Sequence, residues 1–101
     1  MKNQTVKLDG KTWEIEYVRR RDMPKDTYGD CNDKTRKMRV RVDVCGTTWL
    51  DTMIHEMLHA SAFVPLSEQY VTETATAIAV AIVKSKRIKF VDDLSKPAEQ
   101  K

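Results

Sequence analysis

The sequence predicts an α+β domain in which a short, mainly antiparallel β-sheet packs on an antiparallel helix hairpin. Runs within residues 1–46 alternate apolar and polar side chains, as strands do, whereas residues 47–84 carry apolar side chains at helical spacing. With 101 residues, the chain can form one modest hydrophobic core and not two. We therefore expect a single domain over 1–101, with a β-rich part (1–46), a helix hairpin (47–84) and a polar tail (85–101).

The β-rich part opens with a hairpin signal. Asp9-Gly10 separates the runs TVKL and KTWEIEYV, and this dipeptide supplies the positive φ angles of a tight two-residue turn. The run RKMRVRVDV (36–44) also alternates, and its charged side chains suit a strand at the edge of the sheet. Residues 19–35 are highly charged and hold Pro24 and Gly29, so we expect a loop there.

Helix start and stop signals define the hairpin. Thr48 with Asp51 three positions later resembles a capping box, which predicts a helix start near Thr48. Pro65 interrupts the apolar pattern, and Ser67 offers an N-cap for a second helix that runs to about Lys84. Because the connection is short, the two helices are expected to be antiparallel.

Composition limits the possible functions. The net charge is +3, and basic runs occur at 19–21, 36–41 and 84–89. No aromatic residues interleave with these runs for base stacking, so solvated surfaces are favoured over nucleic-acid binding. The longest uncharged apolar stretch, 74–83, is about half of a membrane span, and the N-terminus does not resemble a signal peptide. We expect a cytoplasmic protein with no membrane partner.

The segment DTMIHEMLHASAF (51–63) holds both histidines of the chain. His55 and His59 lie about one helical turn apart and therefore leave the same face of a helix, which suits two nitrogens binding one tetrahedral zinc. Glu56 lies about 100° round that helix, where its carboxylate can take a proton from a water on the metal. This pattern is the H-E-x-x-H motif of zinc peptidases. The alternative is an amphipathic helix whose histidines serve packing or face solvent.

A catalytic zinc needs a third protein ligand, and no other histidine remains. The second helix offers two carboxylates, Glu68 and Glu73. Glu73 is the only charged residue from 69 to 83, in a helix expected to be buried nearly all round, and a buried carboxylate needs a partner. Glu68 follows the expected N-cap, where an acidic residue simply offsets the helix dipole. We therefore predict His55, His59 and Glu73 as the zinc ligands, with Glu68 as the alternative.

Two other assignments are weaker. Cys31 and Cys45 could form a structural zinc site with the histidines, but they lie fourteen positions apart, and closed sites keep cysteines about two to four residues apart. Packing thiols are the favoured interpretation. Tyr28, Tyr70 or a loop arginine could stabilise an oxyanion, and that role stays unassigned.

The segments IHEMLHA (54–60), PLSE (65–68) and YVTETATAIA (70–79) resemble small phage and prophage proteins among the zincin-fold, H-E-x-x-H metallopeptidases of gluzincin type. The resemblance covers roughly residues 28–83. It implies a minimal zincin-like fold, a zinc site of His55, His59 and a second-helix glutamate, and Glu56 as general base.

The same resemblance implies a function. It points to zinc-dependent hydrolysis of peptides or proteins, in the host cytoplasm if the protein is phage-encoded, and it supplies no particular substrate. By analogy with zincins, the run MRVRVDV (38–44) would pair with an extended substrate as an added strand. The rival is a non-catalytic, zinc-stabilised domain that contacts a partner protein or nucleic acid through its basic runs.

Overall fold

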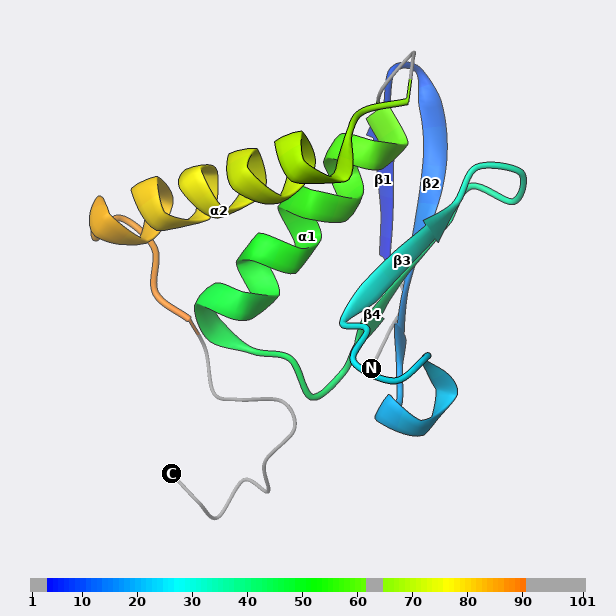
Figure 1. The fold of residues 1–101 in the computed structure, drawn as a ribbon, viewed down its shortest axis with the longest axis horizontal. Helices are drawn as coiled ribbons and strands as arrows, with labels where there is room; N and C mark the ends of the chain where they lie inside the picture. Colours follow the sequence, from blue (N-terminus) through cyan, green and yellow to red (C-terminus); the bar gives the residue numbers. More distant parts are fainter. Residues whose placement is uncertain (1–3, 62–64, 91–101) are drawn as a thin grey trace.

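The computed structural model describes residues 4–61 and 65–90, and Figure 1 shows both helices on one side of a four-stranded sheet. Helix α1 packs against the sheet, and α2 packs against α1, so the α+β prediction is confirmed. The predicted tail falls partly on residues 91–101, which lie outside the described residues. In chain order the elements are β1 (Gln4–Leu8), β2 (Lys11–Val18), the 3-10 helix η1 (Arg20–Asp22), β3 (Gly29–Asn32), β4 (Lys37–Arg41), α1 (Gly46–Ser61) and α2 (Glu68–Lys84).

The strand order is β1-β2-β4-β3, with β1/β2 and β3/β4 antiparallel and β2/β4 parallel. The hairpin prediction is confirmed, since Asp9 and Gly10 both have positive φ, 50° and 75°. The prediction of β4 as an edge strand is wrong, because β4 lies between β2 and β3. The predicted loop 19–35 in fact contains η1 and β3, and β3 has no apolar alternation because it is a short edge strand ordered by its pairing with β4.

The core lies between the inner face of the sheet and α1. Its buried members are Trp13 and Ile15 of β2, Met38 and Val40 of β4, and Met53 of α1. The alternation in the sequence therefore assigns the inner faces of β2 and β4 correctly. Burial of these large side chains fixes the position of α1 on the sheet, and so the orientation of its other faces.

Helix α1 begins at Gly46, two residues before the predicted start. Thr48 does not cap the helix; its carbonyl accepts a hydrogen bond of 2.8 Å from the Thr52 hydroxyl. Asp51 instead accepts a hydrogen bond of 2.7 Å from the hydroxyl of Thr76 in α2. The expected capping box is thus replaced by a link between the two helices.

Helix α2 has the predicted N-cap, because the Ser67 side chain accepts a hydrogen bond from the backbone N–H of Tyr70. Its buried residues are Val71, Ala75 and Ala79, which form one stripe along the face turned to α1. The prediction of a helix buried nearly all round is therefore wrong, since α2 has α1 as its main neighbour. Within the described ranges, neither helix has the length and apolar content needed to cross a membrane.

Candidate metal centre

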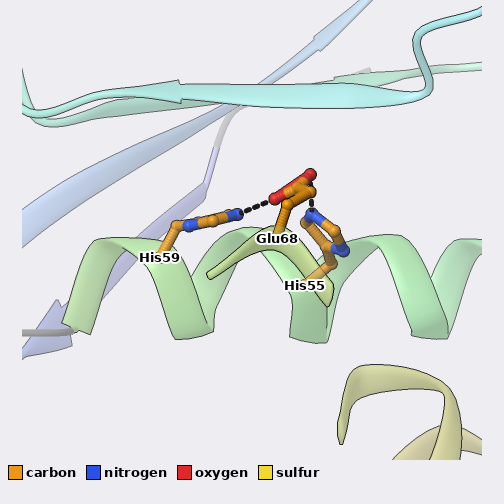
Figure 2. Close-up of side chains that lie close together, drawn as sticks. All are labelled: His55, His59 and Glu68. Carbon is orange, nitrogen blue, oxygen red and sulfur yellow. Dashed lines mark hydrogen bonds and ion pairs between the residues drawn. The ribbon is translucent and has the colours of Figure 1, made fainter. Parts of the chain in front are cut away.

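The two histidines of α1 meet a carboxylate from the first turn of α2. Nε2 of His55 lies 3.2 Å from one oxygen of Glu68, and Nε2 of His59 lies 2.7 Å from the other. Figure 2 shows the three side chains converging above α1, on the side that faces the sheet. The four-residue spacing of the histidines on α1 and the short turn before α2 together produce this convergence.

This donor set fits a zinc ion. Among the described residues, His55, His59 and Glu68 form the group whose potential ligand atoms all lie within 4.8 Å of one another. Tetrahedral zinc with bonds of about 2.0–2.2 Å to nitrogen and oxygen holds its ligand atoms roughly 3.3–3.6 Å apart, so small side-chain movements would suffice. Two imidazoles and a carboxylate are also the ligands of one class of catalytic zinc site.

Glu73, the predicted third ligand, does not join this cluster. It is exposed on α2, and its carboxylate accepts a hydrogen bond of 3.0 Å from the Gln69 side chain one turn earlier. The prediction assumed that this part of α2 is buried and that a lone carboxylate there therefore needs a partner. That assumption is wrong, because the face of α2 that carries Glu73 is exposed to solvent. The structure therefore places Glu68, the weaker alternative from the sequence, beside the histidines.

The charges at the cluster favour an ionised Glu68. Partial burial by itself raises the pKa of this carboxyl, but the hydrogen bond from His59 and the charges of both histidines outweigh it and lower the pKa overall. An ionised carboxylate is the form that binds a metal ion.

Glu56 lies beside the cluster and points to the sheet. Its exposed fraction is 7%, so it is among the few buried charged residues of the described chain. Burial raises its pKa, and the charges of His55 and His59, with a hydrogen bond from the Cys31 thiol, offset this only in part. Glu56 is thus held next to the histidines without being one of the converging ligands.

The Cys31 thiol in β3 lies close to the Glu56 carboxylate, on the sheet side of the site. Burial, the nearby carboxylates of Glu56 and Asp33 and the hydrogen bond to Glu56 raise the pKa of Cys31 to about 12. The thiol therefore stays protonated and can donate its S–H to Glu56. Among the described residues, neither Cys31 nor Cys45 joins the group of His55, His59 and Glu68, so the alternative cysteine-histidine site has no support in the geometry.

Gly29 lets β3 approach α1 closely at this point. A Cβ at Gly29 would lie 2.9 Å from Cγ2 of Thr52, 3.0 Å from the Arg39 carbonyl oxygen and 3.4 Å from Cγ of Glu56. The 2.9 Å contact would force a shift, and the 3.0 Å contact would require a backbone atom to move by a few tenths of an ångström. In the sequence Gly29 marks only a loop, so its packing role emerges only from the fold.

The cluster opens into a cleft between β3 and the two helices. Two adjoining cavities of about 630 and 470 Å³ share Gly29, His55, Glu56 and Glu68 in their walls. Six carboxylate residues line the cleft and no lysine or arginine does, although the whole chain carries a net charge of +3. These carboxylates are Asp26, Asp30, Asp33, Asp51, Glu56 and Glu68.

Of the two tyrosines considered for oxyanion stabilisation, the structure brings one to the cleft. Tyr28 lines the cavity of about 470 Å³, whereas Tyr70 lines neither cavity, and both side chains are exposed. The guanidinium of Arg41 lies over the Tyr28 ring, 5.0 Å from its centre. A tyrosine is thus present at the mouth of the candidate site.

Comparisons with known proteins give no family for this chain: no protein-family model, no curated protein and no solved structure matches it. Inference about function therefore depends on the arrangement of the residues themselves.

Proposed function

We propose that the protein is a zinc-dependent metallopeptidase whose metal ligands are His55, His59 and Glu68. The convergence of these three side chains beside the buried Glu56 is the observation that supports this proposal. The set completes an H-E-x-x-H motif with a carboxylate from the next helix, and three protein ligands leave one position open for chemistry.

The reaction assigns each group a distinct task. Zinc in this site would supply a Lewis acid for hydrolysis of the peptide bond. Glu56 accepts a proton from the attacking water and returns it to the leaving amine. Cys31 and the closely packed Gly29 lie beside Glu56 on the sheet side, and the hydrogen bond from Thr76 to Asp51 links α2 to α1.

The outer edge of β3, which pairs with no other described strand, borders the cleft and is the best candidate for binding the substrate. The earlier expectation placed this role on MRVRVDV, but β4 already pairs on both sides and cannot add a strand. Because the N–H of Arg41 bonds the Tyr28 carbonyl, the alternation of an antiparallel ladder turns the backbone groups of Gly29 and Cys31 away from β4. We infer that these groups pair with an extended peptide.

A proline at position 31 tests the role of this edge. Cys31→Pro removes one outward N–H without breaking a bond to β4, and Cys31→Ala removes the thiol while keeping the N–H. Substrate KM should rise in the proline variant beyond any change in the alanine variant. Equal KM values in the two folded variants would show that the β3 edge does not bind substrate.

The catalytic proposal is tested by Glu56→Gln. The zinc-loaded wild type should cleave members of a mixed peptide library, with the products identified by mass spectrometry. The variant should keep its zinc, but its rate of cleavage should fall by about 10²–10⁴-fold. Glu73→Gln, on the exposed face of α2, is the matched control and should cleave normally. A zinc-loaded wild type that cleaves no peptide would refute the proposal.

A further inference from the structure

A second charged cavity lies outside the candidate metal centre. It has a volume of about 550 Å³ and is formed at the end of β2, by η1 and the loop after it, and by the last residue of β4. We call it the basic pocket; it is lined by Arg19, Arg20, Arg21, Pro24, Lys25, Asp26 and Arg41. Asp26 also lines the cleft, so the basic pocket adjoins it.

Two of the five cations in the basic pocket are already paired. Arg41 makes two hydrogen bonds to Asp43, of 2.9 and 2.7 Å, and lies over the Tyr28 ring. Arg19 pairs with Asp22 at 3.3 Å. The two bonds to Asp43 hold the Arg41 guanidinium in place and offset its charge, whereas the Arg19–Asp22 pair is exposed to solvent and weak.

The other three cations remain available. The side chains of Arg20, Arg21 and Lys25 are exposed and make no hydrogen bond or ion pair with any other part of the described chain. Arg20 contributes only at longer range, by helping to lower the pKa of Asp43. Even with Asp22, Asp26 and Asp43 counted, cations outnumber carboxylates here, so the pocket attracts anions.

The character of the three available cations indicates the ligand. Guanidinium and ammonium groups are strong donors to phosphate oxygens. One isolated phosphate binds only weakly to exposed cations. A phosphate polymer contacts several cations at once and releases several counterions, and this release strengthens binding. No aromatic residue lines the pocket to stack on a base, and no asparagine or glutamine does to pair with an adenine edge.

We propose that the basic pocket binds the phosphate backbone of nucleic acid, without reading its sequence. The juxtaposition of Arg20, Arg21 and Lys25, unpaired around a cavity floored by the fixed Arg41, supports this assignment. The carboxylate-lined cleft next to it repels phosphates, so nucleic acid stays at the pocket and out of the cleft. Binding is therefore independent of zinc and of the proposed peptidase activity.

The test is fluorescence anisotropy of the full chain with 20-mer single- and double-stranded DNA over a range of salt concentrations. The test variant is Arg20→Gln/Arg21→Gln/Lys25→Gln. The control, Lys7→Gln/Lys11→Gln/Lys34→Gln, removes the same three charges from exposed positions elsewhere. We expect the test variant to lose at least about 10-fold in affinity and to flatten the log–log salt slope by about 2–3, because each lost phosphate contact removes about 0.9.

The outcomes separate the proposal from its alternatives. The control should bind within about 2-fold of wild type, and DNAs of different sequence should bind alike. Equal losses in both variants would mean that net charge alone matters, and no wild-type binding would likewise overturn the proposal. The proposal would also be overturned if polyglutamate competed as well as DNA does, or if the protein bound only vesicles of anionic lipid. Glu68→Gln should leave DNA binding unchanged, whether or not peptide hydrolysis is found.

Discussion

Helices α1 and α2 both have apolar sequences, yet they occupy different environments. α1 lies between the sheet and α2, and one of its buried residues is the ionisable Glu56. α2 has α1 as its main neighbour and buries the stripe of Val71, Ala75 and Ala79. The number of layers around a helix thus decides how much of it is buried, and its apolar content does not.

The two helices also contribute unequally to the candidate site. α1 carries His55, Glu56 and His59 on turns held by the core, whereas α2 contributes only Glu68, from its first turn. α1 is more buried and carries two of the proposed ligands, whereas α2 carries one. We therefore expect mutations on the two helices to have unequal effects.

The largest effect is expected from His59→Ala on α1. Metal that binds only the folded state stabilises it, by about 2.7 kcal/mol when zinc is at 100 times its Kd. Excess zinc should therefore raise the unfolding free energy of the wild type and leave that of His59→Ala unchanged. Urea unfolding with zinc and with a chelator measures this, and equal zinc stabilisation of both proteins would contradict the proposed ligand set.

A smaller effect is expected from Gly29→Ala, which acts on the sheet side of α1. The added methyl group meets Thr52 and the Arg39 carbonyl, and overpacking of this kind costs about 1–3 kcal/mol. Because the methyl group also reaches Glu56, peptide hydrolysis should fall further than the loss of folded protein explains.

Gly10→Ala is the control for that substitution. Gly10 has a φ of 75° in the β1–β2 turn and has open space around it, so alanine strains the turn without touching the site. Stability should fall by about 1–2 kcal/mol, while the activity per folded molecule is unchanged. Equal loss of specific activity in both variants would show that β3 does not position Glu56.

The smallest effects are expected on α2. Thr76→Val removes the hydrogen bond to Asp51 and should cost about 0.5–1.5 kcal/mol in urea unfolding. Val80→Thr, the reverse change at an exposed position of the same helix, should stay within about 0.5 kcal/mol. A loss well above 1 kcal/mol in Val80→Thr would mean that this face of α2 is covered in solution.

Much of the fold follows from the sequence because local signals and burial agree there. Alternation identifies the inner faces of β2 and β4, and Asp9-Gly10 and Ser67 mark a turn and a cap that the structure contains. The strand β3 escapes prediction because its order comes from pairing with β4 and from close packing at Gly29. Neither cause leaves a local pattern in the sequence.

The candidate site is predictable only in the part that one helix carries. His55, Glu56 and His59 are related by helical geometry alone, whereas the third residue of the cluster depends on which face of α2 meets α1. Glu68 precedes Val71 by three positions and Ala75 by seven, so it extends the buried stripe toward the histidines. Glu73 lies outside that stripe. That it is the only charged residue from 69 to 83 does not indicate that it contacts α1.

Zinc titration of Glu68→Gln and Glu73→Gln by calorimetry tests the central claim most directly. The two substitutions are the same chemical change on one helix, five positions apart. We predict that Glu73→Gln binds one zinc with wild-type affinity, and that Glu68→Gln binds more than about 100-fold more weakly, beyond the loss typical of a supporting residue. Wild-type zinc affinity in Glu68→Gln, or the loss of zinc in Glu73→Gln alone, would contradict the assignment.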